Sequence, residues 1–281
     1  MINTPSPLRY PGGKTVLYEK VKNIINQNIS GKCTYIEPFA GGCGLALKLL
    51  FNSNVEKVII NDYDYAIYCI WDSILNNNEQ YVEKINNINI DIEEWNRQRY
   101  IYENKQNYSK IDIAIATLFL NRTNISGVIK GGPIGGIKQK GKYKIDCRFN
   151  KKTLIDKIQK IYNYKDKIEL YNMEANEFIK KIITKREENT FIYLDPPYFQ
   201  KGPILYKNFF NKENHKELSN VIKDNLENYN WIVTYDNNEI IKEMYNAYKI
   251  ETFDLPYSAG NNKKGKEIMI YSNMLKYKGE N

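Results

Sequence analysis

Four consecutive residues, Asp195, Pro196, Pro197 and Tyr198, follow the apolar run FIYL and carry the most specific chemistry in the chain. The two prolines fix φ and lack backbone N–H groups, so carbonyl oxygens near them stay free to accept hydrogen bonds. Asp195 and the Pro196 carbonyl can accept the two N–H groups of a planar amine, while Tyr198 stacks on its ring. Such a pocket would orient a poorly nucleophilic base amine and stabilise charge on its nitrogen during attack on a methyl sulfonium.

A second segment, YIEPFAGGCG at 35–44, follows an expected strand and precedes an expected helix. Its small residues let the backbone approach a ligand closely. The next expected strand ends near Asp62, and an acid at that place commonly binds ribose hydroxyls. The other interpretation is a helix cap, which Asp64 could serve equally well. Loop and acid together favour an adenosine-containing cofactor.

Several classes of protein are excluded by the sequence. PGGKT at 11–15 resembles the end of a phosphate-binding loop, but Leu8 stands where that motif needs glycine. The four cysteines form no CxxC pair and His215 is the single histidine, so we expect no metal site and a reduced, cytoplasmic compartment. No apolar run approaches the ~20 residues that span a bilayer, and the N-terminus has no secretory signal, so no membrane partner is expected.

Apolar runs bounded by turn residues predict seven strands, and helical patterns lie between most of them. This alternation predicts a parallel sheet covered on both faces, with an antiparallel pair at one edge where a polar loop joins the last two strands. The strands are expected at 33–39, 55–61, 167–172, 190–194, 230–235, 248–253 and 267–272, and the helices at 16–29, 44–51, 64–76, 111–120, 174–183, 211–229 and 238–246.

The alternation is interrupted between 77 and 160, which predicts an inserted domain within a catalytic domain made of 1–76 and 161–281. The insertion becomes glycine-rich and basic, which predicts a loop or hairpin at about 123–150. Residues 138–152 hold seven basic side chains and one acid. A solvated loop is one interpretation, and the net charge of +8 can also reflect AT-rich codons. We favour phosphate contact, because every second residue of 138–144 is a lysine, as on one face of an extended strand.

Taken together, the motifs resemble those of the Dam-like, alpha-class DNA adenine-N6 methyltransferases. The resemblance implies an α/β fold, the seven-stranded class I methyltransferase (Rossmann-like) sheet of order 3-2-1-4-5-7-6, with an inserted, mainly helical target-recognition domain that carries the basic hairpin or loop. The matching segments, in the family's order, are PLRYPGGKT (7–15), YIEPFAGGCGLAL (35–47), INDYD (60–64), FLNRTNISG (119–127), FIYLDPPY (191–198), IVTYDNN (232–238) and GKEIMIYSN (265–273).

The resemblance also implies roles for individual residues. Asp195, Pro196, Pro197 and Tyr198 match the catalytic motif, while Glu174 stands where an aspartate is usual for a contact to the cofactor's adenine. The residues that match the cofactor site are Tyr10, Lys14, Glu37, Phe39, Ala40, Gly41, Asp62 and Asp195. The residues expected to bind DNA are Asn121, Arg122, Lys138, Lys140, Lys142, Lys144 and Arg148.

The function implied is methyl transfer from S-adenosylmethionine to N6 of an adenine flipped out of double-stranded DNA. We expect a monomer, with a cognate restriction enzyme as a candidate partner. One alternative is a cytosine-N4 or RNA methyltransferase with the same pocket, and another is an inactive DNA-binding homologue, which the intact Tyr10, Lys14 and Asp62 argue against. A protein glutamine methyltransferase would more typically carry asparagine in place of Asp195.

Overall fold

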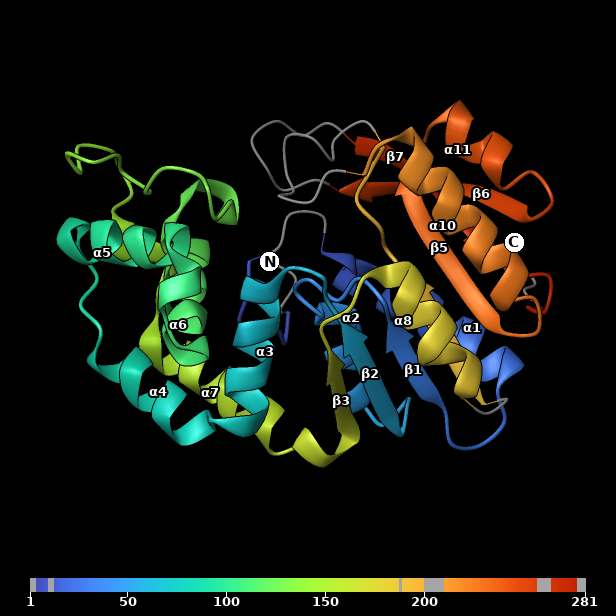
Figure 1. Ribbon diagram of the computed structural model, residues 1–281, viewed down its shortest axis with the longest axis horizontal. Helices are drawn as coiled ribbons and strands as arrows, with labels where there is room; N and C mark the ends of the chain where they lie inside the picture. The colour runs from blue at the N-terminus through green and yellow to red at the C-terminus, as the bar shows by residue number, and fades with distance from the viewer. Residues whose placement is uncertain (1–3, 10–12, 187–188, 200–209, 257–263, 277–281) are drawn as a thin grey trace. The chain divides into compact units, whose positions relative to one another are not determined.

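The computed structural model describes residues 4–9, 13–186, 189–199, 210–256 and 264–276. Its sheet has seven strands in the order β3-β2-β1-β4-β5-β7-β6 (Figure 1). β1 is parallel to β2 and β4, β4 is parallel to β5, and β7 is antiparallel to both β5 and β6. The strands are β1 (Thr34–Glu37), β2 (Lys57–Asn61), β3 (Ile168–Tyr171), β4 (Thr190–Leu194), β5 (Asn230–Asp236), β6 (Lys249–Pro256) and β7 (Lys264–Tyr271). This order confirms the class I methyltransferase fold.

Helix bounds follow capping residues in the sequence. The side chains of Asp64, Ser109 and Asn150 accept hydrogen bonds from the first turns of α3, α6 and α7, which satisfies donors that have no partner inside the helix. The helices are α1 (Tyr18–Asn28), α2 (Gly44–Phe51), α3 (Tyr65–Asn76), α4 (Asn78–Asn87), α5 (Ile92–Glu103), α6 (Lys110–Thr123), α7 (Lys151–Tyr162), α8 (Ala175–Lys181), α10 (Lys212–Asn225) and α11 (Glu239–Met244). None of the described helices is long and apolar enough to cross a membrane.

The chain divides into two compact units. One consists of Met1–Gly13 with Asp64–Leu170, and the other of Lys14–Tyr63 with Tyr171–Asn281. The expected insertion, 77–160, falls entirely within the first, which is mainly helical. The second contains most of the sheet, so we call it the sheet unit and its counterpart the helical unit.

The core of the sheet unit explains why its central strands are apolar throughout. All five residues of β4 are buried, as are the last six of β5, which is typical of strands covered on both faces. On one face, side chains of β1, β4 and β5 form a continuous buried cluster with α8, α10 and α11. In Figure 1, α8 and α10 lie in front of the sheet. The strand ends are thereby held in a fixed register.

Residues 124–148 of the helical unit, the basic loop, differ from the expectation. The described loop has a single β-bridge, between Asn124 and Pro133, followed by turns and a short 3₁₀ helix. The prediction that 138–144 form an extended strand is therefore wrong. The reason is conformational, because Gln139 has a φ of 48° and the glycines at 135 and 136 have φ of 86° and 74°, values incompatible with the alternation of a strand.

Candidate active site

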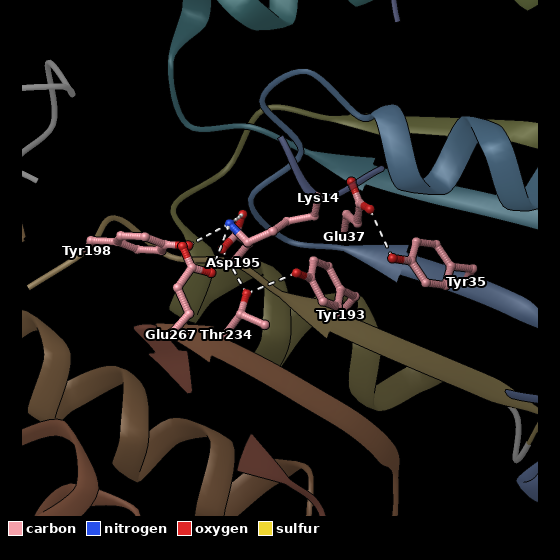
Figure 2. A network of polar contacts seen from close by, with 8 residues as sticks. All are labelled: Lys14, Tyr35, Glu37, Tyr193, Asp195, Tyr198, Thr234 and Glu267. Atoms are coloured by element: carbon pink, nitrogen blue, oxygen red, sulfur yellow. Dashed lines mark hydrogen bonds and ion pairs between the residues drawn. The ribbon is translucent and has the colours of Figure 1, made fainter. Parts of the chain in front are cut away.

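Asp195 lies immediately after the last residue of β4 and beside β5. The parallel register pairs Leu194 with Val233, so the next residue of each strand, Asp195 and Thr234, are neighbours. The Thr234 hydroxyl donates a hydrogen bond to Asp195 Oδ1 at 2.8 Å. Figure 2 shows Asp195 at the centre of a polar network built from β4, β5, β7 and the segment that precedes α1. The strand register thus determines where the acid stands.

Lys14 reaches the other oxygen of the same carboxylate. Its ammonium donates to Asp195 Oδ2 at 2.9 Å and to the Tyr198 hydroxyl at 2.6 Å, and it lies 3.9 Å from Glu267 (Figure 2). The Lys14 side chain is only 5% exposed. The sequence predicted Lys14 at the cofactor; the structure brings its ammonium onto the carboxylate of the DPPY motif.

Glu267 and Tyr198 complete this network on the side of β7. Glu267 is buried and projects from β7, while the Tyr198 ring lies beneath the Lys14 ammonium at 4.9 Å. Burial raises the pKa of Tyr198 well above its usual value, and the neighbouring Asp195 and Glu267 carboxylates add to the shift. Tyr198 is therefore a neutral phenol. Lys14 is the cation that lies between the Asp195 and Glu267 carboxylates.

Glu37 is the last residue of β1 and stands directly before the glycine loop. Its carboxylate is buried and accepts a hydrogen bond from the Tyr35 hydroxyl at 2.9 Å (Figure 2). Burial raises the pKa of Glu37 to about 8, although the Tyr35 hydrogen bond opposes the shift. Gly41 and Cys43 have φ of 45° and 52°, and α2 begins directly after them at Gly44. The loop is thus a tight left-handed turn leading into a helix N-terminus.

The two acids after β2 have separate positions. The Asp62 carboxylate accepts a hydrogen bond from the Gly41 backbone N–H at 2.8 Å, which attaches it to the glycine loop. Asp64 caps α3 through the Ala66 N–H at 2.9 Å. The helix cap is therefore Asp64. Glu174 in turn caps α8 by accepting from the Glu177 N–H, which gives its carboxylate a structural partner.

These groups suit the chemistry of S-adenosylmethionine. A tight turn of small residues offers backbone at close range, and Asp62 offers a carboxylate beside it that can accept from ribose hydroxyls. Ala40 is buried and Phe39 half-buried next to this turn. Tyr10, the remaining predicted cofactor residue, lies outside the described residues. Among the described residues, no group of three or more His, Cys, Asp or Glu side chains could hold a metal ion.

The predicted DNA-binding residues lie in the helical unit in two different situations. Asn121 is buried, and its amide accepts from the Arg9 N–H at 2.8 Å and donates to the Arg9 carbonyl at 2.7 Å. The Arg122 Nε donates to the Arg148 carbonyl at 2.7 Å. In contrast, Lys138, Lys140, Lys142, Lys144 and Arg148 are exposed. Asn121 and Arg122 thus hold the backbone at Arg9 and Arg148, whereas the cations of the basic loop face solvent.

Arg9, Arg122 and Lys157 show that positive charge is concentrated in this unit. Burial lowers the pKa of all three, to about 10 for Arg122, and neighbouring cations lower it further: Arg148 acts on Arg9 and Arg122, and Arg122 acts on Lys157. The Cys147 thiol opposes the pKa shift of Arg9, and no described carboxylate is among the groups that act on the three cations. Such a cluster is typical of a surface that meets an anion.

Three residues of the Asp195 network were not identified from the sequence: Thr234, Tyr193 and Glu267. The Tyr193 hydroxyl lies 2.9 Å from that of Thr234, and both side chains are buried. Thr234 and Glu267 do lie in the quoted segments IVTYDNN and GKEIMIYSN. Aligning the ends of adjacent strands would have placed Thr234 beside Asp195; nothing in the sequence indicates the reach of the Tyr193 hydroxyl.

Two curated proteins and one solved structure are similar to this chain. The chain is 26% identical over 272 residues to the Type II methyltransferase M.CviBI of Paramecium bursaria Chlorella virus NC1A, with 89% of this chain and 90% of that protein covered. It is 21% identical to the Type II methyltransferase M.MjaIII of Methanocaldococcus jannaschii, with 97% and 93% covered. Among solved structures, the rRNA methyltransferase aviRa from Streptomyces viridochromogenes is similar at 10% identity and a TM-score of 0.41, with 94% and 87% covered.

A family match covers most of the chain. Residues 10–258 match the D12 class N6 adenine-specific DNA methyltransferases, a span that includes the glycine loop, Asp62 and the DPPY motif. The fold has the class I strand order, and the Asp195 carboxylate stands at the C-terminal end of β4. The chain belongs to the D12 class of N6 adenine-specific DNA methyltransferases.

Proposed function

We propose that the chain methylates N6 of a flipped-out adenine in double-stranded DNA with Asp195 as the residue that receives the amine, and with S-adenosylmethionine as methyl donor. Membership of the adenine-specific DNA methyltransferase family supports the substrate and the reaction. The single observation that carries the assignment to Asp195 is its carboxylate, held between Lys14 and Thr234 at the end of β4. The extrusion of the base is expected because a base that is stacked and paired within the duplex cannot enter a catalytic pocket.

S-adenosylmethionine supplies an electrophilic methyl group on a positively charged sulfur. Asp195 accepts a hydrogen bond from the adenine amine and directs the nitrogen lone pair, which is otherwise delocalised into the ring, toward that methyl group. When a C–N bond forms and the C–S bond breaks, the carboxylate would stabilise the positive charge that develops on nitrogen; the sulfur would leave as S-adenosylhomocysteine, and the nitrogen would then release one proton. Each carboxylate oxygen has two lone pairs, so Oδ2 keeps its bond to Lys14 while it accepts the amine.

We assign the cofactor to the glycine loop of the sheet unit. In this proposal Asp62 accepts from the ribose hydroxyls, and Gly41 and Ala40 provide the close backbone. Glu37, the buried last residue of β1, accepts a hydrogen bond from Tyr35 and borders the methionine part together with Phe39. Tyr10 remains a predicted cofactor residue.

We assign DNA backbone contacts to the helical unit. Arg148 and the lysines of the basic loop are exposed, and Arg9 and Arg122 lie among cations without a carboxylate to offset them. DNA phosphates would relieve this repulsion. Asn121 and Arg122 serve this surface indirectly, because their hydrogen bonds hold the backbone at Arg9 and Arg148.

A role beside a restriction enzyme is also proposed. Two relatives are named Type II methyltransferases, which favours a protein that marks one sequence against a cognate nuclease. The DNA substrate favours a cytoplasmic location, and we expect a monomer. Resistance of plasmids from expressing cells to a panel of nucleases, together with the solution mass, checks these points.

The decisive experiment offers tritiated S-adenosylmethionine to DNA duplexes, RNA and protein in parallel and then analyses the labelled nucleosides. We expect label only in DNA and only in N6-methyladenine. Label in N4-methylcytosine or in RNA would overturn the assigned substrate. Sequencing the modified DNA at base resolution then gives the recognition sequence.

A further inference from the structure

We infer that Thr234 and Tyr193 are positioning residues for methyl transfer, which fix the orientation of the Asp195 carboxylate through two consecutive hydrogen bonds. This inference rests on the proposed role of Asp195. Neither residue need touch the substrate; both act through the acid. Figure 2 shows the chain of contacts from Tyr193 through Thr234 to Asp195.

The backbone brings these three side chains together. Tyr193 and Asp195 are two residues apart along the direction of β4, so they lie on the same side of the sheet. Thr234 comes from the neighbouring strand, because the parallel register pairs the preceding residues Leu194 and Val233. The resulting distances are 2.9 Å from Tyr193 to Thr234 and 2.8 Å from Thr234 to Asp195.

The direction of the hydrogen bonds follows from the number of protons. The Asp195 carboxylate, which is ion-paired with Lys14, only accepts, so Thr234 uses its single hydroxyl proton to donate to Oδ1. The Tyr193–Thr234 bond must then run from the phenol to the threonine oxygen. Burial raises the pKa of Tyr193 well above its usual value, and the nearby Asp195 adds to this, so the phenol keeps its proton. The chain of donors therefore ends on the catalytic acid.

Packing alone does not require a hydroxyl at this place. Thr234 is fully buried in a strand whose neighbouring residues are Val233 and Tyr235, and valine has the same shape as threonine without a polar group. A buried hydroxyl is costly unless it is hydrogen-bonded, and here both of its bonds belong to the Asp195 chain. The branched side chain also has few rotamers, which fixes the oxygen in place.

The two oxygens of the Asp195 carboxylate therefore have different partners. Oδ1 is fixed to β5 by Thr234, so the plane of the carboxylate cannot rotate freely. Oδ2 accepts from Lys14 and, like Oδ1, keeps one lone pair for the adenine amine. Without Thr234 the acid would keep its bond to Lys14, but the plane of the carboxylate could turn about that single contact.

The test measures single-turnover methyl transfer to duplex DNA and, separately, S-adenosylhomocysteine affinity by calorimetry. Thr234→Val should slow transfer about 10- to 100-fold, the size typical of losing a hydrogen bond to a charged group. Thr234→Ser, which keeps the donor, should stay within about 3-fold of wild type. Tyr193→Phe should slow transfer about 2- to 10-fold. All three should bind S-adenosylhomocysteine as tightly as wild type does.

The double variant T234V/Y193F distinguishes positioning from packing. If Tyr193 acts only through Thr234, the double variant should be no slower than Thr234→Val alone, whereas independent packing defects would multiply. Thr117→Val is the matched control, since it removes another fully buried threonine hydroxyl, one that donates to the Ile113 carbonyl in the helical unit. Its transfer rate should equal that of wild type.

Two results would overturn the inference: a Thr234→Val rate within 3-fold of wild type, or a loss of S-adenosylhomocysteine affinity that parallels the loss of rate. If Thr234→Val does not fold, Tyr193→Phe decides, because full activity in that variant contradicts the chain. Asp195→Ala separates this from the proposed function. An active Asp195→Ala refutes the assigned role of the acid, whereas an inactive Asp195→Ala beside a fully active Thr234→Val refutes only the positioning role.

Discussion

Lysines in the two units of this protein illustrate opposite uses of the same charge. Lys14 in the sheet unit is almost fully buried and shares its ammonium among Asp195, Tyr198 and Glu267. Lys138, Lys140, Lys142 and Lys144 of the basic loop are exposed, and within the described part of the chain none of them forms an ion pair.

The difference determines what each region responds to. Buried charges are poorly screened, and removing one partner leaves another uncompensated, so the Lys14 network should be sensitive to single atoms and to protonation. Exposed cations act on a distant polyanion through counterion release, so the basic loop should be sensitive to salt.

The largest effect is expected from Asp195→Ala. Transfer should fall about 100- to 1000-fold, the cost of removing one oriented group that stabilises developing charge. Single-turnover rates at saturating cofactor measure it. Asp166→Ala, which removes an exposed carboxylate in the helical unit, is the control and should leave the rate unchanged. An Asp195→Ala rate within a few-fold of wild type would remove the acid from the chemistry.

The next effect concerns the basic loop. Changing Lys138, Lys140, Lys142 and Lys144 to glutamine should lower the slope of log affinity against log salt by about 3.6 if each lysine meets one phosphate. Cognate and scrambled duplexes should lose affinity alike, and the methylated sequence should not change, because phosphate contacts carry no sequence information.

A charge-matched control exists in the sheet unit. A control variant changes four exposed lysines of this unit to glutamine and so removes the same amount of charge: Lys180, Lys185, Lys216 and Lys223. The slope of its log DNA affinity against log salt should match that of wild type. Equal slopes for wild type and the loop variant would mean that the loop is merely solvated and that the charge run reflects codon composition.

These two regions also differ in how far the sequence predicted them. All seven strands were expected close to their observed bounds, because buried parallel strands are apolar runs whose ends must align, and this alignment puts Asp195 at the site. The basic loop has no such constraint. The glycines of this segment predicted a loop and the alternation of its lysines suggested a strand within it; the positive φ of Gln139 excludes that strand, and nothing in the sequence indicates this value.

Inside the site, the sequence predicted which residues belong there but not which of them contact one another. Lys14 was expected at the cofactor, yet its ammonium meets Asp195, since the reach of a long side chain depends on packing that the sequence does not display. α4, α5 and α7 were not separately predicted within 77–160, although the side chains of Asp91 and Asn150 cap α5 and α7. A capping residue alone does not predict a helix, and this region has no strands whose alternation with helices would indicate one.

A smaller effect is expected from Asp62→Ala. A ribose that loses its acceptor, and a glycine loop that loses its anchor at Gly41, should weaken S-adenosylhomocysteine binding by about 1–3 kcal/mol. Calorimetry measures the change. Asp64→Ala is the matched control two residues away: it removes the cap of α3 and should cost about 1 kcal/mol of stability while cofactor affinity stays constant. Equal affinities for wild type and Asp62→Ala would place the ribose elsewhere.

The smallest effect, a pH dependence, separates the two regions most cleanly. In the cofactor-free protein the pKa of Glu37 is raised by burial from 4.5 to about 8, so the folded state binds a proton that the unfolded state releases. This contribution to stability is complete below pH 4.5 and is lost as pH rises through 8. His215, whose pKa is lowered by burial from 6.5 to about 4, acts oppositely, since its contribution is complete above 6.5 and is lost as pH falls through 4.

Between pH 6.5 and 8, therefore, Glu37 alone of these two groups changes stability. Urea unfolding across this window should show wild type losing stability with rising pH, while Glu37→Gln, which has the same shape and no charge to bury, should stay level. The quadruple loop variant should keep the wild-type slope, because its four substitutions lie in the helical unit and leave Glu37 and its partner Tyr35 unchanged. Parallel slopes for wild type and Glu37→Gln would contradict a buried, protonatable Glu37. If the loop variant changed the dependence of stability on pH, the basic loop would respond to protons as well as to salt, which would contradict the contrast between the two regions.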